Sequence, residues 1–307
     1  AKKLLEQQRG YSFQVATGFD RAAFQKAGSE ELSPHPLITM RAMELRLATA
    51  SMAGLAASEL SATLRLPNDI NRTSGAVRQL ADHYRSRNTS DRKRLETLRR
   101  VQIRLAEAVP SDFVNILKET EGDIRIVADA HLEWLDIEGL PLGLRKNVSR
   151  IPVTPGNLFV EQTGASPPIR LAPEDFNKIL LISALKRDDP INAMFESALE
   201  VSNPVWRDEI SLQVVEVGSE DELVEALNAY DGPLLMFDGH GSHRPDGPAL
   251  LHLQDASCDV WTLRGRARVP PIVFLSACDT HAANRNHETT ANGFLSLGAR
   301  SVLGSVF

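Results

Sequence analysis

Two short apolar runs, Leu234-Leu-Met-Phe-Asp-Gly-His-Gly241 and Ile272-Val-Phe-Leu-Ser-Ala-Cys-Asp-Thr280, are the most informative part of this sequence. Each run is rich in branched or aromatic residues and is bounded by Gly, Pro or Asp, which is typical of buried strands in a parallel sheet. Side chains just past the ends of such strands lie where α/β proteins place their chemistry. The sequence therefore predicts that His240 and Cys278 lie together at one edge of a sheet.

A thiol beside an imidazole indicates nucleophilic catalysis. The thiol becomes a useful nucleophile when a nearby base takes its proton, and imidazole titrates in the right range for that task. We therefore predict that His240 and Cys278 are the base and nucleophile of a cysteine hydrolase. A structural alternative stays open, because free cysteine is often buried and inert. The second cysteine, Cys258, lies in a polar segment between the two runs and is expected to be non-catalytic.

The elements around these runs predict an α/β fold. Helices are expected after Asp189-Pro190, where Asp would cap the helix, and after Ser219, which has capping-box spacing to Glu222. Alternating strands and helices imply parallel pairing, right-handed crossovers and a mostly parallel sheet with helices on both faces. The expected strands before the second apolar run cover residues 178–184, 212–217 and 234–237.

The first third of the chain differs in composition. Residues from about Met40 to Val109 are rich in Ala, Leu, Arg and Glu, which predicts a mainly helical region, and Asp91–Val109 is expected to form a long helix. The residues expected on its apolar face are Leu95, Leu98, Val101, Ile103, Leu105 and Ala108. Eight basic residues against two acidic ones lie between Arg85 and Arg104. No aromatic residues interleave with them to stack on bases, so a solvated or partner-binding face is favoured over nucleic acid.

A change of pattern at residue 122 marks the expected domain boundary. Ile124–Asp129 and His131–Asp136 are interpreted as two short strands around a tight turn. We therefore divide the chain into a mainly helical region, residues 1–121, and an α/β domain, residues 122–307. The 307 residues and 42% apolar content are compatible with two domains.

Composition excludes several classes of protein. The net charge of −6 gives no field that would attract nucleic acid or an anionic membrane, and two cysteines are too few for a disulfide framework, which favours the cytoplasm. The weakly polar stretch Leu47–Ser58 is shorter than the roughly 20 residues of a membrane span, so we expect a buried helix there. The chain does not begin with Met, and we expect it to be a fragment of a longer protein.

No cofactor and no metal are expected from the motifs. Residues 238–247 carry glycines, but they match neither G-x-G-x-x-G before a helix nor a Walker loop, which argues against a phosphate-binding domain. The chain contains no C-x-x-C pair, and its histidines are scattered over expected loops and strands, which argues against zinc.

The segments around His240 and Cys278 resemble those of the caspase-like CHAT peptidases, which are grouped with caspases, metacaspases, gingipains and separase. Gly-His-Gly at one strand end and Ser-Ala-Cys-Asp-Thr at another, 38 residues later, carry this resemblance. It covers about Gly122 to Phe307. Within that span, Ile124–Leu144 is similar to the hairpin that opens CHAT domains, and Phe294–Gly304 is similar to the helix and strand that follow the cysteine.

This resemblance implies a cysteine endopeptidase that acts through a thioester acyl-enzyme, with His240 as base and Cys278 as nucleophile. It also implies an oxyanion site made of the backbone N–H groups of Gly241 and Cys278, and it requires no third catalytic group. Asp238 and Asp279 are the candidate substrate-binding residues, and either carboxylate in a pocket would favour a basic residue before the cut. Two further interpretations of Asp238 stay open, orienting the imidazole and capping the loop at the strand end.

CHAT peptidases are commonly attached to sensing or adaptor regions. The resemblance therefore implies a protein substrate and a partner or ligand that acts through residues 1–121, in a prokaryotic regulatory or defence system, with Arg99 and Arg100 as candidate contacts. CHAT domains usually continue past a strand such as Ser301–Phe307, so we expect the domain to be incomplete there. The alternative is a catalytically silent caspase-like scaffold that serves as an interaction protein.

Overall fold

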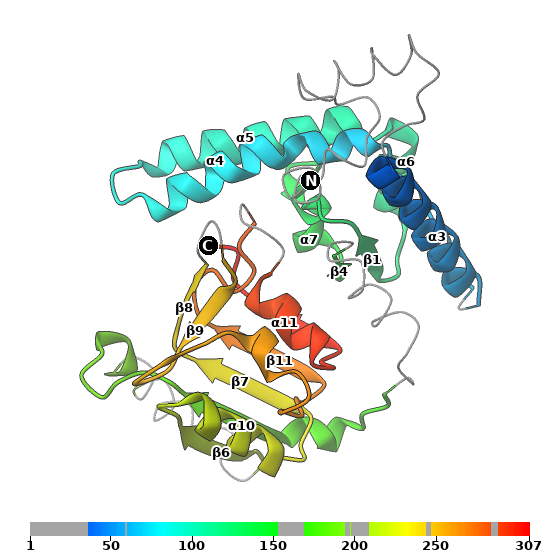
Figure 1. Ribbon diagram of the computed structural model, residues 1–307. Helices are drawn as coiled ribbons and strands as arrows, with labels where there is room; N and C mark the ends of the chain where they lie inside the picture. The colour runs from blue at the N-terminus through cyan, green and yellow to red at the C-terminus, as the bar shows by residue number, and fades with distance from the viewer. Residues whose placement is uncertain are drawn as a thin grey trace. The chain divides into compact units, whose positions relative to one another are not determined.

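The computed structural model describes residues 36–58, 60–152, 169–193, 197, 209–243, 247–283 and 288–307. The chain divides into two compact units, Ala1–Gly156 and Asn157–Phe307. The second unit contains a five-stranded parallel sheet, and the first is mainly helical in its described part (Figure 1). The predicted fold class, an α/β domain preceded by a helical region, is confirmed. Within the described residues, no helix is long and apolar enough to cross a membrane.

The sheet of the second unit has the spatial order β6-β5-β7-β11-β12, and every neighbouring pair is parallel. β6, which follows β5 in the chain, therefore lies at one edge of the sheet. The chain then returns to form β7 on the other side of β5. The carboxyl ends of β5 and β7 flank the point where the order reverses, which is where open α/β sheets bind ligands. The strands are β5 (Lys178–Ser183), β6 (Ser211–Glu216), β7 (Leu234–Asp238), β11 (Ile272–Ser276) and β12 (Ser301–Leu303).

Two helices, α10 (Glu220–Ala229) and α11 (Thr290–Ser296), cover one face of this sheet. Leu227 and Phe294 of these helices are fully buried in one cluster with Phe237 of β7. Right-handed crossovers require this arrangement, because the β6–β7 and β11–β12 connections run in the same direction across the sheet. The β5–β6 connection runs in the opposite direction and therefore crosses the other face, and its described start at residues 190–193 is helical.

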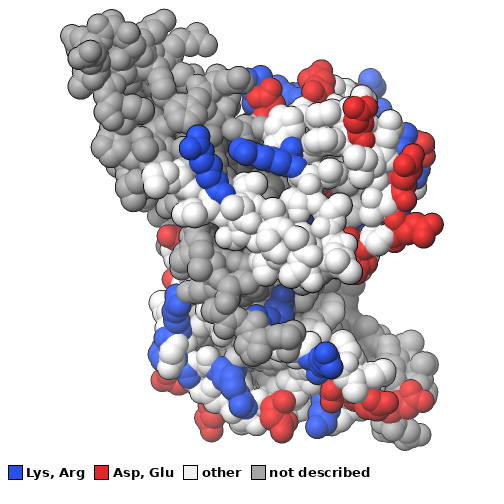
Figure 2. Space-filling view, turned by 90° about the vertical axis from the view of Figure 1, so that its right-hand side faces the viewer, with Lys and Arg blue, Asp and Glu red and all other residues white. Residues whose placement is uncertain are grey.

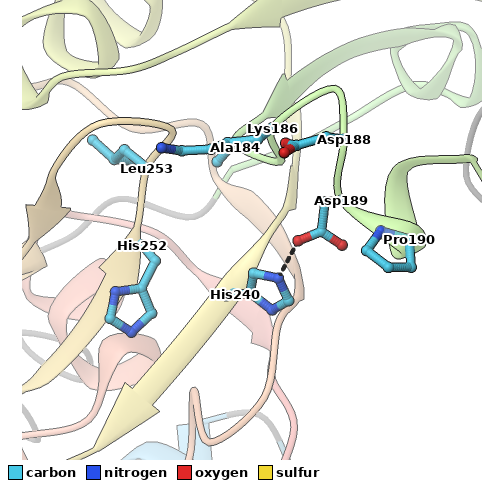
Figure 3. A pocket seen from close by; sticks show the side chains of 8 residues that line it. All are labelled: Ala184, Lys186, Asp188, Asp189, Pro190, His240, His252 and Leu253. Carbon is cyan, nitrogen blue, oxygen red and sulfur yellow. Dashed lines mark hydrogen bonds and ion pairs between the residues drawn. The ribbon is translucent and has the colours of Figure 1, made fainter.

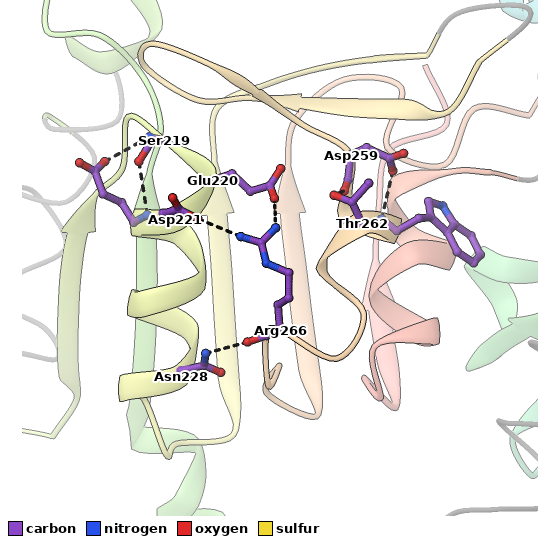
Figure 4. A network of polar contacts seen from close by, with 9 residues as sticks. Ser219, Glu220, Asp221, Asn228, Asp259, Thr262 and Arg266 are labelled. Atoms are coloured by element: carbon purple, nitrogen blue, oxygen red, sulfur yellow. Dashed lines mark hydrogen bonds and ion pairs between the residues drawn. The ribbon is translucent and has the colours of Figure 1, made fainter.

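The predicted capping box of α10 is present. Ser219 Oγ accepts a hydrogen bond from the Glu222 backbone N–H at 3.3 Å, and Glu222 Oε2 accepts one from the Ser219 N–H at 3.1 Å. Arg266, which follows the short helix η5 (Val260–Leu263), pairs with Glu220 and Asp221 in the first turn of α10 (Figure 4). Local sequence thus starts the helix, and one arginine fixes it to a distant segment.

The residues that follow β7 form a second sheet. It is antiparallel, with the order β8-β9-β10, and consists of β8 (His240–His243), β9 (Ala249–His252) and β10 (Ser257–Cys258). His240 is paired with His252 across β8 and β9. This sheet fixes the backbone from His240 onwards, which alternating glycines and polar residues did not predict.

In the first unit, α4 (Ser74–Arg85) packs along α5 (Asp91–Ala108). The long helix predicted from residue 91 is confirmed, and Ser90 caps it by accepting a hydrogen bond from the Lys93 N–H. Its predicted apolar face is correct in part, because Val101 and Leu105 are buried together with Thr97 at a spacing of four residues, whereas Leu95 and Ile103 are exposed.

Before residue 122, the described part of the chain forms three further helices: α3 (Pro36–Ser58), η2 (Asn68–Thr73) and α6 (Ser111–Glu119). The prediction that Leu47–Ser58 is buried is wrong, since the Leu47 side chain is 66% exposed. Across the part of the surface in Figure 2 that is described, Lys and Arg side chains are interspersed with Asp and Glu side chains.

The segment after residue 122 is built differently from the prediction. β1 (Ile124–Val127) is present, but it pairs in parallel with β4 (Val148–Ile151), and the expected second strand is a short helix, η3 (Leu132–Trp134). His131 explains the difference, because its ring stacks on Trp134 with centroids 4.5 Å apart and bonds the half-buried Glu133 at 2.8 Å. Burial raises the pKa of the Glu133 carboxyl. The hydrogen bond from His131 and the charge of Arg150 have the larger combined effect, so that the pKa lies below its usual value.

A hairpin does form a few residues later, between β2 (Asp136–Ile137) and β3 (Leu140–Pro141), before the short helix α7 (Leu142–Arg145). Its turn residues, Glu138 and Gly139, both have positive φ, which is the conformation of a type I′ turn. η3 and β2 contact α5, so this segment belongs to the first unit. The division between the units therefore falls after Gly156, later than the expected start of the domain at residue 122.

Candidate active site

Strand register places the two predicted catalytic residues at equivalent positions. Asp238, the last residue of β7, is paired with Ser276, the last residue of the neighbouring strand β11. His240 follows the first of these by two residues, and Cys278 follows the second by two residues. Because parallel strands in register end at the same edge of a sheet, the two side chains start from adjacent points.

The turns that carry these side chains touch each other. The Gly239 N–H donates to the Ser276 carbonyl at 3.2 Å. A Cβ placed on Gly241 would overlap the backbone carbonyl oxygen of Cys278, so glycine is required at this position by close approach rather than by its backbone angles. The structure therefore brings the His240 segment and the Cys278 segment together, as the sequence predicts.

The two cysteines differ in accessibility. Cys278 is exposed. Cys258 is fully buried in the core of the second unit, and burial raises the pKa of its thiol from an ordinary value of 9.0 to about 12. Since the thiolate is the nucleophilic form, only Cys278 is suited to nucleophilic chemistry. Cys258 lies in strand β10, although its polar neighbours in the sequence gave no sign of burial.

Hydrogen bonds from the end of the chain hold the Cys278 turn. Thr280, which is fully buried, accepts from the Ser305 N–H at 2.8 Å, and the Ser305 hydroxyl donates to the Ala277 carbonyl at 2.6 Å. The His281 N–H donates to the Ser305 carbonyl at 2.8 Å. We call Ala277, Thr280, His281 and Ser305 the Thr280 clasp. It fixes the backbone on both sides of the cysteine.

Asp189 is the residue that bonds His240. The His240 Nε2 atom lies 2.8 Å from Asp189 Oδ2, and the side chains of the two residues are 49% and 20% exposed (Figure 3). The hydrogen bond from His240, followed by one from the Ile191 N–H, holds the pKa of the Asp189 carboxyl below its usual value. An ionised carboxylate only accepts hydrogen bonds, so Nε2 of His240 is the donor.

His240 and Asp189 border a cavity of about 310 Å³ at the carboxyl ends of β5 and β7. This position is the reversal point of the sheet order, where ligand sites are expected. The residues that line it are Ala184, Lys186, Asp188, Asp189, Pro190, His240, His252 and Leu253 (Figure 3).

Asp238, the last residue of β7, is buried, with an exposure of 4%. Ser276 Oγ donates to its Oδ1 atom at 2.9 Å. Burial raises the pKa of Asp238 above its usual value, although the Ser276 hydrogen bond opposes this effect. The second candidate acid, Asp279, has a φ of 54° in the turn after Cys278. The acids that line the cavity are Asp188 and Asp189, and a substrate-binding role for Asp238 or Asp279 stays a prediction.

Sequence reasoning missed two members of this site. Asp189 was interpreted only as a helix cap, and His252 was given no functional role. The signal for Asp189 was available, because it lies in the segment that follows β5, but its use required knowing that β5 and β7 are neighbours. His252 bonds Ser242 through Nε2 at 2.8 Å and Ser257 through Nδ1 at 2.9 Å, which anchors it within β8–β10.

The oxyanion site predicted at the N–H groups of Gly241 and Cys278 stays a prediction, although both groups lie where the two turns meet. Among the residues that the structure describes, no group of three or more His, Cys, Asp or Glu side chains is arranged to hold a metal ion. No family model matches this chain, and no curated protein is significantly similar to it. The resemblance to CHAT peptidases therefore rests on the motifs around His240 and Cys278.

Proposed function

We propose that this protein is a cysteine endopeptidase that cleaves a protein substrate, with Cys278 as nucleophile and His240 as general base. The observation that supports this most is the register of β7 and β11, which pairs Asp238 with Ser276 two residues before the catalytic side chains. An exposed thiol, an imidazole in the adjoining turn and a neighbouring cavity are the parts that acyl transfer to sulfur requires.

In the proposed reaction, His240 takes the proton of Cys278, and Sγ attacks the scissile carbonyl to form a C–S bond. His240 then gives this proton to the leaving amine as the C–N bond breaks, which leaves a thioester. Water attacks the thioester, the C–S bond breaks, and the thiol regains a proton. Each backbone donor to the oxyanion, Gly241 and Cys278, is expected to contribute about 100- to 1000-fold in rate.

The proposal includes regulation through residues 1–121. An unregulated endopeptidase would damage the cell that makes it, so we propose that a partner or ligand adjusts the His240 and Cys278 turns, in the cytoplasm of a prokaryote and in a regulatory or defence role. Arg99 and Arg100 are exposed on α5, and Arg100 also donates to Gln79 at 2.9 Å. Once an activator is known, changing both arginines to Glu should weaken activation, and unaltered activation would exclude this contact.

Cleavage of a pooled peptide library, with new termini identified by mass spectrometry, tests the peptidase. We expect cleavage by the full chain and none by Cys278→Ala, with the residue before the cut defining specificity. If neither protein cleaves, a peptidyl electrophile separates the two explanations. Labelling of Cys278 would indicate a missing activator, whereas no labelling would indicate the catalytically silent scaffold.

A further inference from the structure

The contact between His240 and Asp189 joins residues that are 51 positions apart in the chain. Both residues line the cavity, and the contact uses one ring nitrogen of His240, Nε2. The other ring nitrogen, Nδ1, is thus left as the atom that can exchange a proton. Which nitrogen carries the proton in a neutral imidazole depends on the hydrogen bond that the other one makes.

Asp189 is held in place independently of His240. Its Oδ1 atom accepts from the Ile191 N–H at 2.9 Å, while Oδ2 is the atom that bonds the imidazole. Its backbone N–H donates to the Lys186 carbonyl, and its own carbonyl accepts from the Asn192 N–H, both at 3.0 Å. The start of the helix therefore fixes the carboxylate, so that the imidazole is oriented by a rigid partner.

Other polar groups near the site have different partners. Asp238, the other acid close to His240, accepts from Ser276. His252 is bonded at both ring nitrogens to serine hydroxyls. Lys186 and Asp188 line the cavity along with Asp189. The Lys186 Nζ atom lies 3.7 Å from Asp255 Oδ1. Asp189 is the acid whose contact with the imidazole is direct.

We propose that Asp189 is a positioning residue that holds His240 with its proton on Nε2, so that Nδ1 exchanges the proton between Cys278 and the leaving amine. Asp189 also stabilises the imidazolium that forms when Cys278 gives up its proton. The inference rests on the proposed peptidase, because the proton transfer belongs to that reaction. It gives the site three side chains from the ends of three neighbouring strands, β5, β7 and β11.

The test compares Asp189→Asn with Asp259→Asn in the full chain. Asparagine is as good a helix cap as aspartate, so the helix start is kept in Asp189→Asn, while the charge opposite His240 is lost. Asp259 is the matched control, because it caps η5 by accepting from the Trp261 N–H at 3.0 Å and does not line the cavity. Histidine NMR, with the His240 signals assigned by a His240→Gln variant, reports the tautomer without any substrate.

In the unaltered chain we expect the neutral tautomer with the proton on Nε2. Asp189→Asn should move the proton to Nδ1, because the amide that replaces the carboxylate donates a hydrogen bond to Nε2. Asp259→Asn should keep the Nε2 tautomer. A proton on Nδ1 in the unaltered chain, or the Nε2 tautomer in Asp189→Asn, would overturn the proposal.

Cleavage of the best library peptide provides the second readout. Asp189→Asn should lower kcat at least 100-fold with a smaller change in KM, whereas Asp259→Asn should retain most of the unaltered kcat. Full kcat in Asp189→Asn would reject the positioning role and leave the peptidase standing. A chain that cleaves nothing, but whose His240 tautomer still depends on Asp189, would reject the peptidase and retain the pairing.

Discussion

At the scale of single residues, Gly241 is a position where a larger residue does not fit. A Cβ there would collide with the carbonyl oxygen of Cys278, which is backbone and cannot move without displacing the nucleophile. The requirement comes from a contact with a turn 37 residues later, and the residues next to Gly241 contain no sign of it.

We therefore expect Gly241→Ala to abolish cleavage or to lower kcat/KM more than 100-fold, because a small displacement at a reacting centre costs about this much. Gly239→Ala should be milder, since the Cβ would meet side-chain atoms of Phe237 and Ala184. Gly75→Ala, with open space around it, is the control and should leave kcat/KM unchanged. Equal activity of Gly241→Ala and the control would contradict the close contact between the two turns.

The two cysteines give a second prediction at this scale. With a pKa of about 12, Cys258 is almost entirely protonated at pH 8, and it is also inaccessible. Iodoacetamide at pH 8 should therefore add one label to the native chain, at Cys278, none to Cys278→Ala, and two to the chain in guanidinium, as counted by mass spectrometry. Labelling of Cys258 at a comparable rate in the native chain would show that its burial is not maintained in solution.

At the scale of elements, local sequence signals were reliable where the contacts that they imply are also local. The capping box of α10 joins residues three apart, and the start of a helix at Pro190 follows from its own dipeptide. The expected strand His131–Asp136 failed because the stacking of His131 on Trp134 stabilises a helical turn there. In that segment, side-chain packing outweighed the local preference for a strand.

The Thr280 clasp is the element-scale feature that we expect to matter for the nucleophile. Thr280→Val removes the hydroxyl that bonds the Ser305 N–H, and an unsatisfied buried donor costs about 1–3 kcal/mol. We expect the unfolding midpoint of the second unit to fall by several degrees, together with slower alkylation of Cys278. Thr262→Val, which removes an exposed hydroxyl bonded to the Asp259 carbonyl, is the matched control. Similar midpoints for both variants would argue against the clasp.

At the scale of the whole molecule, the division after Gly156 separates the site from the helical unit. All residues that line the cavity, and Cys278, belong to the second unit. In the first unit, Leu135, Ile137 and Leu142 are buried in a segment whose η3 and β2 contact α5. A fragment that starts at residue 122 would separate this segment from the helix that it contacts.

We therefore expect a fragment of residues 157–307 to unfold cooperatively and to retain alkylation of Cys278 at close to the rate of the full chain. A fragment of residues 122–307 should bind a dye specific for exposed apolar surface and give a lower soluble yield, because the apolar side chains that contact α5 lose their cover. Circular dichroism melts and dye fluorescence measure these properties. The opposite ranking of the two fragments would favour the domain boundary predicted at residue 122.

The sequence by itself determined the α/β class, most of the strands of the parallel sheet, the capped helices and the two residues on which the proposed chemistry depends. These features follow from apolar runs and caps, whose physical causes act over a few residues. Tertiary structure alone decided that Asp189 meets His240, that Cys258 is buried while Cys278 is exposed, and that the segment after residue 122 packs on α5. Each of these depends on which strands and helices become neighbours, and that choice is made by packing between segments far apart in the chain.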